Sequence, residues 1–348
     1  MEYSPIRPAD RQAMAAAQAR WNAIGKPVGS LGRMEQLLVQ IAGVTGSPDI
    51  DLSKKCVVVC CADNGVLAQG VAQSTHDITT VIGRSLVRGT ASVSAMAKAV
   101  GAEVFPVDVG MIDRVPGMLD RRIGPGTGDI STGPAMTRSQ AIAAIETGIE
   151  LVRQRKAEGF KILATGEAGI GNTTTSSAVL SVLLRQSPET VTGRGSGLSD
   201  EGLARKVQAI RSAIEVNAPD PTDALDVLSK VGGFDLCAMT GLFLGGGIFR
   251  MPVIMDGLIS GAAALCAVTL CETVRDYILP SHETAEPAGK LLLERLHMAP
   301  MIHGDLRLGE GTGAVALMAL LELSAAVYNH AATFEQLQME AYHEWNSN

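Results

Sequence analysis

Two glutamates, Glu310 and Glu167, lie in glycine-rich stretches of the sequence that adjoin apolar runs. In LRLGEGTGAVAL at 306–317, Glu310 lies between two glycines just before an apolar, helix-like run. In FKILATGEAGIGNTTTSSAVL at 160–180, Glu167 follows an apolar run that leads into a glycine-rich turn. A carboxylate is costly in apolar surroundings unless it is paired, protonated or used. Such a pair, able to face each other across a ligand, can remove a proton or stabilise positive charge.

The turn around Glu167 has the composition of an anion-binding loop. A strand, a glycine-rich turn and a helix opened by Thr and Ser direct backbone N–H groups and a helix N-terminus toward one point. The spacing from Gly166 to Thr173 matches the P-loop pattern, except that Asn172 replaces its lysine. Since that lysine reaches the β- and γ-phosphates, its loss argues against a nucleoside triphosphatase and favours a single phosphate or a ribose. The alternative is a tight turn that needs its glycines only for packing.

Two further polar stretches are candidates for phosphate contact. TGRGSGLSDEGLARK at 192–206 ends in a helix with Lys206, a flexible point charge suited to a phosphate. LPSHETAEPAG at 279–289 contains Ser281 and Thr284, whose hydroxyls could donate to a phosphate or cap the next helix. A solvated helix face is the alternative explanation of the lysine.

Patterns that specify several other chemistries do not occur in the sequence. The six histidines show no HExxH or other metal spacing, and there is no G-x-S-x-G elbow of a hydrolase. The adjacent acidic pair Asp200–Glu201 does not follow a strand, whereas enzymes that use phosphoribosyl pyrophosphate hold magnesium with acidic pairs after one. We therefore expect no metal and no cofactor, and a monophosphate as any phosphoribosyl donor.

Short apolar segments alternate with helix-like segments, which is typical of a doubly wound, mostly parallel sheet of the α/β class. Strands are expected at 56–63, 102–110, 160–166 and 251–257, and helices at 8–24, from 33, at 77–100, 138–158, 173–185 and after 257. The stretch 110–137 is expected to be a loop. Because ligands gather at the carboxyl ends of parallel strands, four residues are expected on one rim there: Asp63, Asp108, Gly166 and Asp256.

The composition of the 348 residues argues against several partners. The net charge is −7 and aromatic residues make up 3%, which disfavours nucleic acid. The most apolar region, 236–271, has no uncharged stretch of about 18 residues, so we expect no membrane span. The N-terminal residues have no signal-peptide pattern, and the cysteines form no CxxC pair, which favours a cytoplasmic protein. Trp21 and Trp345 indicate a small helical subdomain made from the two chain ends.

Six stretches together resemble one family. In chain order they read RWNAIGKPVGSLGRMEQL, CADNGV, VDVGM, GEAGIGNTTT, SHETAEPAG and LRLGEGTGAVAL. They are similar to the nicotinate-nucleotide:dimethylbenzimidazole phosphoribosyltransferases of cobalamin biosynthesis, and the resemblance spans about 20–325. It implies a Rossmann-like catalytic domain at 46–325, a small helical domain made of 1–45 and 326–348, and a homodimer.

The resemblance also implies a reaction and roles for three residues. Phosphoribose moves from nicotinate mononucleotide to 5,6-dimethylbenzimidazole with inversion, which gives α-ribazole 5′-phosphate and nicotinate. Glu310 corresponds to the family's general base, Glu167 to its second carboxylate, and Lys206 to a lysine near the phosphate. The glycines beside Glu310 would let a flat base approach closely.

From these stretches we expect two groups of ligand contacts. Phosphate and ribose are expected at Lys206, Gly169, Gly171, Asn172, Thr173, Gly193, Gly195 and Thr284, and the base at Ser74, Ile82 and Leu308. The sequence departs from the family at Asn64, where members often carry His, and over 74–82. These departures leave open another benzimidazole, a purine or a phenol as the accepted base.

Two other functions compete with this one. A nicotinamide-dinucleotide oxidoreductase would need G-x-G-x-x-G after the first strand, where this sequence has CADNGV. A non-catalytic nucleotide-binding module would use the same loop, with Glu310 only a carboxylate at the start of a helix.

Overall fold

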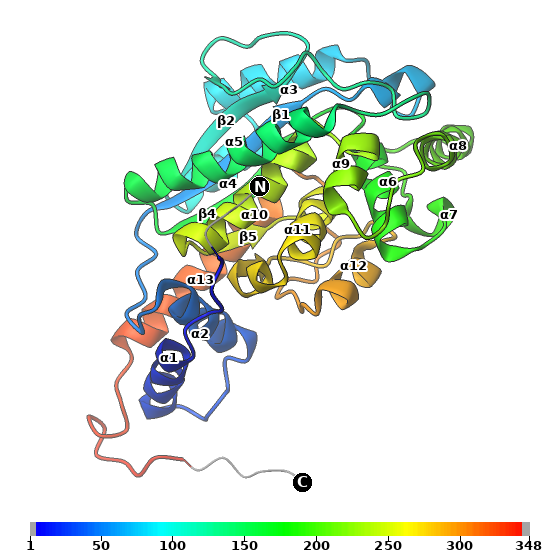
Figure 1. Ribbon diagram of the computed structural model, residues 1–348. Helices are drawn as coiled ribbons and strands as arrows, with labels where there is room; N and C mark the ends of the chain where they lie inside the picture. The colour runs from blue at the N-terminus through cyan, green and yellow to red at the C-terminus, as the bar shows by residue number, and fades with distance from the viewer. Residues whose placement is uncertain (1–4, 343–348) are drawn as a thin grey trace.

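The computed structural model describes residues 5–342 and contains one sheet of six parallel strands (Figure 1). The strands are β1 (Lys55–Ala62), β2 (Ala102–Gly110), β3 (Leu119–Asp120), β4 (Ile162–Ala168), β5 (Val253–Met255) and β6 (Ile278–Pro280). Their order in the sheet is β3-β2-β1-β4-β5-β6, which is the Rossmann order. The predicted fold class is confirmed.

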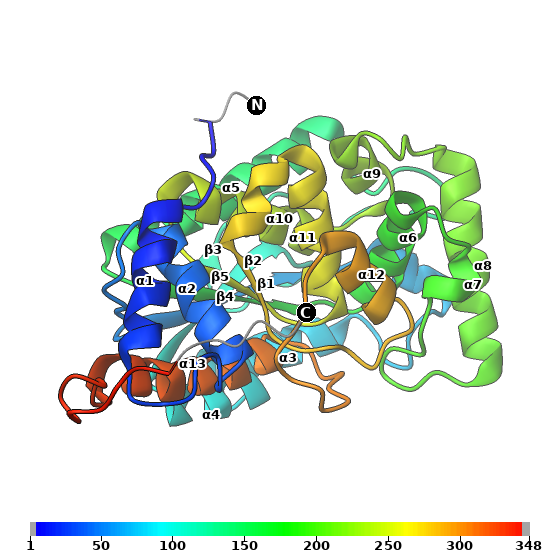
Figure 2. The ribbon, with the colours of Figure 1, turned by 90° about the horizontal axis from the view of Figure 1, so that it is seen from below.

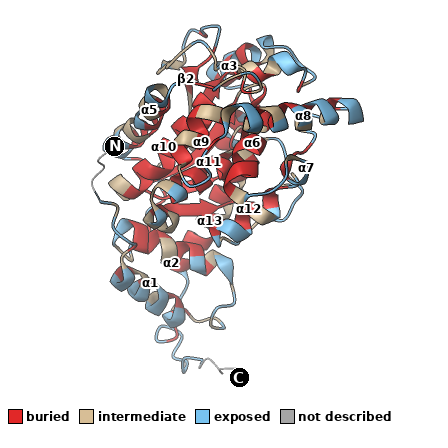
Figure 3. Cartoon of the chain, turned by 45° about the vertical axis from the view of Figure 1, so that its right-hand side comes forward, coloured by how far each residue is buried: buried red, intermediate tan, exposed pale blue. Residues whose placement is uncertain are grey.

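Helices cover both faces of this sheet. Their bounds are α1 (Arg11–Ala23), α2 (Arg33–Thr45), α3 (Asp77–Arg88), α4 (Ser92–Ala99), α5 (Arg138–Ala157), α6 (Asn172–Leu184), α7 (Pro188–Val191), α8 (Asp200–Asn217), α9 (Ala224–Val231), α10 (Phe234–Phe249), α11 (Leu258–Leu270), α12 (Gly289–Leu296) and α13 (Thr312–His330), with 3₁₀ turns at Gly65–Gln69 and Glu272–Tyr277. Figure 3 shows the buried residues concentrated in the sheet, α10 and α11, whereas α1 and α8 expose much of their surface.

The alternation of side chains along β1 explains the two layers of helices. Val58 and its neighbours on one face belong to a core shared with α5, α10 and α11, whereas Val57 and Val59 belong to a second core shared with α2, α4 and α13. Because successive side chains of a strand point to opposite faces, a strand buried on both faces is apolar throughout. All eight residues of β1 are buried, and the seven that follow Lys55 are apolar.

The structure corrects several predicted boundaries. The helix expected at 77–100 is two helices, since α3 ends at Arg88 and the next residue, Gly89, is in the left-handed region with φ 70°. The third strand runs from 162 to 168 instead of 160–166, so Glu167 lies in the strand and not in the turn after it. The strand expected at 251–257 is only three residues long, and β3 lies inside the stretch expected to be a loop.

The helices nearest the two ends of the chain lie together at one side of the sheet. Figures 1 and 2 both place α1 and α2 beside α13, and Trp21 is fully buried with its ring 5.0 Å from that of Tyr328. Trp345 lies outside the described residues. Because α13 runs unbroken through residue 325, it belongs to both proposed domains, and the division at 46 and 325 stays a prediction.

Among the described helices, α13 is long and apolar enough to cross a membrane by length and composition alone. Of its most apolar stretch, 56% is buried inside the protein. Leu317, Met318 and Leu321 pack into the core on one face of the sheet. This packing accounts for the apolar composition of α13.

Candidate active site

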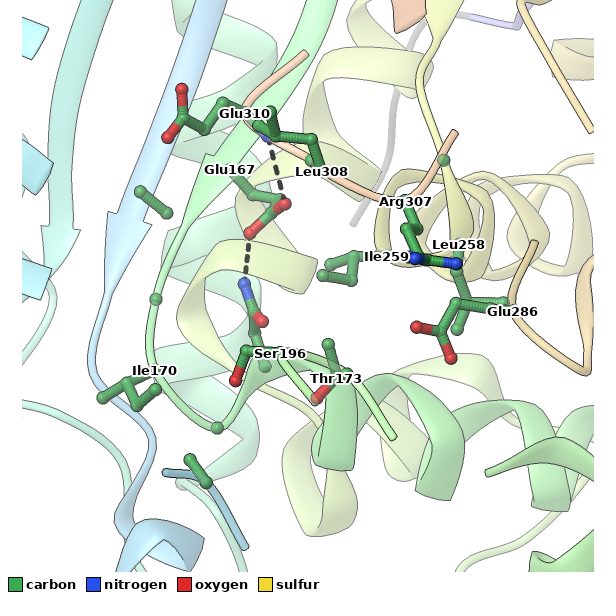
Figure 4. Close-up of a pocket in the computed structure, with 18 of the residues that line it drawn as sticks. Glu167, Ile170, Thr173, Ser196, Leu258, Ile259, Glu286, Arg307, Leu308 and Glu310 are labelled. Atoms are coloured by element: carbon green, nitrogen blue, oxygen red, sulfur yellow. Dashed lines mark hydrogen bonds between the residues drawn. The ribbon is translucent and has the colours of Figure 1, made fainter. Parts of the chain in front are cut away.

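A pocket of about 260 Å³ opens at the carboxyl ends of β4 and β5 (Figure 4). The strand order reverses between β1 and β4, and ligands of open α/β sheets bind at this point. Asp63 and Asp256 directly follow β1 and β5, as expected for this rim. Asp108 lies near the carboxyl end of β2, within the strand predicted for it, whereas Gly166 lies inside β4, which continues to Ala168. Neither residue lines the pocket.

The turn that carries Glu310 has three successive residues in the left-handed region, with φ of 91° at Gly309, 61° at Glu310 and 97° at Gly311. A Cβ on Gly309 would lie 2.5 Å from Oε1 of Glu167, and one on Gly311 would lie 2.9 Å from Val57. The glycines are therefore required because the turn lies directly on β4 and β1. A left-handed conformation at a residue with a side chain is strained, and such strain is concentrated at functional sites.

Glu310 and Glu167 interact through a backbone group. The N–H of Glu310 donates to Oε1 of Glu167 at 3.4 Å, and the carboxylate of Glu310 accepts from the N–H of Val93, in the first turn of α4, at 3.3 Å. Figure 4 shows the two carboxylates directed to different sides. The two lie together as predicted, but the expectation that they face each other was wrong.

Burial makes Glu167 an unusual carboxyl group. It lies on the pocket wall with 7% of its surface exposed, and the side-chain amide of Asn172 donates to its Oε2. Burial, followed by the nearby charges of Asp235 and Asp256, raises the pKa of Glu167 to about 8. The hydrogen bonds from Asn172 and from the Glu310 backbone oppose this rise.

Asp256 anchors the turn that carries Glu310. Its carboxylate accepts from the N–H of Gly311 at 3.2 Å and of Ala314 at 2.9 Å, at the N-terminus of α13. Burial raises its pKa to about 6, and these backbone donors oppose the rise. The end of β5 thus fixes the position of the turn.

The other end of the pocket is polar. Gly169, Gly171, Asn172, Thr173, Gly195 and Thr284 all line it. Lys206 and Gly193 do not line it and lie directly behind, since Nζ of Lys206 donates to Oγ1 of Thr173 at 2.8 Å and to the carbonyl of Gly193 at 3.1 Å. Burial lowers the pKa of Lys206 to about 8, against the raising effect of Glu286. Phosphate contact by this lysine stays a prediction.

The predicted base contacts lie toward α3 and the end of the chain. Ser74 and Ile82 line the pocket beside Ile78, and Leu308 stands at its mouth with 58% of its surface exposed. All three residues therefore line the same cavity as the two glutamates. Their contact with a base stays a prediction.

Sequence reasoning missed several polar residues of this pocket, among them Arg307, Glu286 and His282. Arg307 and Glu286 point toward one another across its polar end (Figure 4), and His282 is held by a hydrogen bond of 2.9 Å between its Nδ1 and Oγ of Ser281. Each lies in a stretch that carries the family resemblance, which was the available signal. Within residues 5–342, no group of three or more His, Cys, Asp or Glu side chains is arranged to hold a metal ion.

Known proteins resemble this chain along nearly its whole length. The family model described as phosphoribosyltransferase matches residues 6–339. A nicotinate-nucleotide–dimethylbenzimidazole phosphoribosyltransferase of Ruminiclostridium cellulolyticum is 44% identical over 339 residues, which are 97% of this chain and 96% of that protein. One of Desulforudis audaxviator is 45% identical over 333 residues, which are 95% and 94% of the two chains.

Solved structures agree with this result. The crystal structure of CobT from Thermus thermophilus matches with a TM-score of 0.89 at 37% identity, over 94% of this chain and 99% of that one. The resemblance inferred from six short stretches is thereby confirmed. Because sequence and fold agree over almost every described element, this chain belongs to the phosphoribosyltransferase family that these relatives represent.

Proposed function

We propose that this protein transfers phosphoribose from nicotinate mononucleotide to 5,6-dimethylbenzimidazole and releases α-ribazole 5′-phosphate and nicotinate. Relatives that match nearly the whole chain bear the name of this activity. The observation that carries the proposal is the strained turn of Glu310, hydrogen-bonded to the buried Glu167 in a pocket with an apolar and a polar end. No observation favours transfer to another base or a non-catalytic module.

The reaction needs one proton to be removed and none to be added. One nitrogen of dimethylbenzimidazole attacks C1′ of the ribose while the bond from C1′ to the nicotinate nitrogen breaks. The electron pair of that bond neutralises the positively charged ring nitrogen, so nicotinate leaves without protonation. Glu310 takes the N–H proton of the attacking base. Attack from the face opposite nicotinate converts the β-nucleotide into the α-product.

Glu167 stabilises the positive charge that develops on the ribose ring. Because burial raises its pKa to about 8, it is mostly protonated at neutral pH in the absence of the donor. The positively charged ring of the donor favours the ionised form, so the donor and the ionised carboxylate stabilise each other. Asn172 and the N–H of Glu310 keep the carboxylate in place.

The polar end of the pocket receives the phosphate. Thr173 lies in the first turn of α6, where backbone N–H groups and the helix N-terminus favour an anion. Lys206 supplies positive charge from behind Thr173, which it contacts through the hydroxyl. Thr284 and Gly195 line the same end.

The apolar end receives the base. Ile82, Ile78 and Leu308 offer apolar surface for a flat ring, and Ser74 offers a hydroxyl. Glu310 joins this end to the rest of the pocket, which suits a base that must take a proton from the bound ring.

We also propose that the protein is a cytoplasmic homodimer with a catalytic domain at 46–325 and a small helical domain from the chain ends. Exposed apolar side chains on helices that cover one face of the sheet support an interface there: Val81, Val87, Met96 and Leu323. Light scattering after size-exclusion chromatography tests the dimer, and a mass of one chain would contradict it.

The function is tested by incubating the purified protein with nicotinate mononucleotide in EDTA and following nicotinate release on addition of dimethylbenzimidazole. Release that depends on the added base supports the proposal. Release only with a purine or a phenol would mean that the apolar end of the pocket accepts a base other than dimethylbenzimidazole. No release with any base, from folded protein, would contradict the transfer.

A further inference from the structure

The carboxylate of Glu310 is held by the N-terminus of a helix that lies far from it in the sequence. Oε2 of Glu310 accepts the backbone N–H of Val93 at 3.3 Å, across 217 positions of the chain. Val93 is the second residue of α4, and its side chain is fully buried. Within residues 5–342, no hydrogen bond engages Oε1 of the same carboxylate. One oxygen of Glu310 is therefore anchored, and the other is available to a ligand.

The helix that supplies this N–H has no cap of its own. The first N–H groups of a helix lack partners inside it and are usually capped by the side chain of the preceding residue. In α4 that residue is Ala91, which has no side-chain acceptor. The carboxylate of Glu310 takes the place of the missing cap, because an N-cap Ser, Thr, Asp or Asn would compete with it for the same N–H groups.

Packing fixes α4 relative to the turn that carries Glu310. The helix packs against α13 and β2 (Figure 2), and Val93 and Ala97 lie in the core that also contains Leu317 of α13. Asp256 holds the backbone of the turn but leaves the side chain of Glu310 able to rotate. The N–H of Val93 restricts this rotation from a helix that is itself held in place.

The helix that anchors Glu310 follows directly on the helix that lines the end of the pocket proposed for the base. Ile78 and Ile82 of α3 line that end, and only the turn 89–91 separates α3 from α4. Figure 4 shows the carboxylate of Glu310 directed away from that of Glu167. One segment of the chain therefore places both the acceptor ring and the group that deprotonates it.

We propose that the backbone N–H of Val93 is a positioning group for the transfer, which holds Oε2 of Glu310 so that Oε1 takes the N–H proton of the bound dimethylbenzimidazole. As the ring nitrogen bonds to C1′ and nicotinate leaves, the proton passes to Oε1. Oε2 then becomes the carbonyl oxygen of a carboxylic acid and still accepts from Val93. The proposal rests on the proposed function, because the transfer is its readout. Val93 does not line the pocket, so it acts only through Glu310.

The test compares wild type with V93P, which removes the N–H and keeps an apolar side chain of similar size. Proline is tolerated in the first turn of a helix, where the N–H groups have no partner in the helix. We expect kcat of V93P to fall about 10- to 100-fold, because the proton acceptor is no longer held in its reactive position. KM for nicotinate mononucleotide should change less than about threefold, since the anchor does not touch the polar end of the pocket.

The matched control is S92P. It places proline one residue earlier in the same turn, at the first helical position that proline favours, and leaves the N–H of Val93 in place. Ser92 is exposed and makes no contact with the pocket. This variant should have the kcat of wild type.

A double variant separates the positioning of Glu310 from a general disturbance of α4. Because E310Q cannot take the proton, loss of its anchor should have no further effect, and V93P/E310Q should have the kcat of E310Q. A double variant whose loss equals the product of the two single losses would mean that Val93 acts independently of Glu310. A V93P variant with the kcat of wild type would also overturn the proposal.

A second variant covers the case in which circular dichroism shows that V93P does not fold. A91D gives α4 a cap of its own, whose carboxylate accepts from the first-turn N–H groups and repels that of Glu310. It should lower kcat about 10-fold and leave Tm at least as high as that of wild type, which a purely structural defect would not do. Wild-type kcat in A91D would contradict the proposal. An inactive wild type would instead contradict the proposed function.

Discussion

The backbone N–H of Glu310 donates to the carboxylate of Glu167 at 3.4 Å, which joins two residues 143 positions apart. The bond places the turn before α13 against the end of β4. It forms only because Gly309 has no side chain, since a Cβ there would lie 2.5 Å from the accepting oxygen. The backbone of Glu310 is therefore a hydrogen-bond donor to the carboxylate of Glu167. A shift of either residue displaces the other.

Gly309→Ala tests this close contact. The alanine is strained at φ 91° and its Cβ collides with Glu167, so the variant should lose about 2 kcal/mol or more of unfolding free energy together with most of its activity. Gly29→Ala is the matched control, because Gly29 has φ 68° with nothing within 4 Å of the added Cβ. It should lose about 1 kcal/mol and keep its activity. If urea denaturation shows the same loss of unfolding free energy in the two variants, the close contact with Glu167 does not contribute to stability.

Glu167 should make the stability of the protein depend on pH. Burial raises its pKa from 4.5 to about 8, so its favourable contribution to stability is complete below about pH 4.5 and is lost as pH rises through about 8. In Glu167→Gln this dependence disappears. Thermal unfolding should show the Tm of wild type falling relative to the variant by a few degrees between pH 6 and pH 9. A difference in Tm that stays constant with pH would contradict the raised pKa.

Donor binding should release a proton. At pH 7 to 8 Glu167 is partly protonated, and the positively charged ring of nicotinate mononucleotide favours its ionised form. Calorimetric titrations in phosphate and in Tris, which differ in ionisation enthalpy, should give different binding enthalpies at pH 7.5. E167Q serves as the control and should show a smaller difference. Equal enthalpies for wild type in the two buffers would exclude this coupling.

Lys206→Met should weaken donor binding selectively. The lysine is 1% exposed and contacts Thr173 at the polar end of the pocket, so loss of its charge should raise KM for nicotinate mononucleotide about 10-fold and leave KM for the base unchanged. Because burial lowers its pKa to about 8, wild type should lose donor affinity as pH rises through 8, and the variant should lose less. An unchanged donor KM in the variant would remove Lys206 from phosphate binding.

The sequence contained enough to predict the sheet because apolar runs and helix periodicity are local properties. The strands at 56–63 and 102–110 agree with β1 and β2 to within a residue. The predicted turn around Glu167 was placed too early, since Gly166 and Glu167 have weak strand propensity and are held in β4 by pairing with Val59 and Cys60 of β1. Tertiary pairing of this kind overrides the local signal.

The site residues were predicted from composition, but their contacts were not. Lys206 was expected at the phosphate, and only the fold shows that Thr173 stands in front of it. Asp256 was expected on the rim, and only the fold shows that it caps α13 and fixes the turn of Glu310. These contacts join residues 33 to 58 positions apart, and no periodicity within one element encodes them.

Glu310→Gln tests the central claim most directly. Glutamine has the size of glutamate and leaves the left-handed turn unchanged, but its side-chain amide cannot take the N–H proton of the attacking base. We expect kcat to fall about 100- to 10,000-fold while the Kd for nicotinate mononucleotide stays near that of wild type. Glu335→Gln, at an exposed carboxylate outside the pocket, is the control and should match wild type. A Glu310→Gln variant that forms α-ribazole 5′-phosphate at the rate of wild type would contradict the assignment of Glu310 as the base.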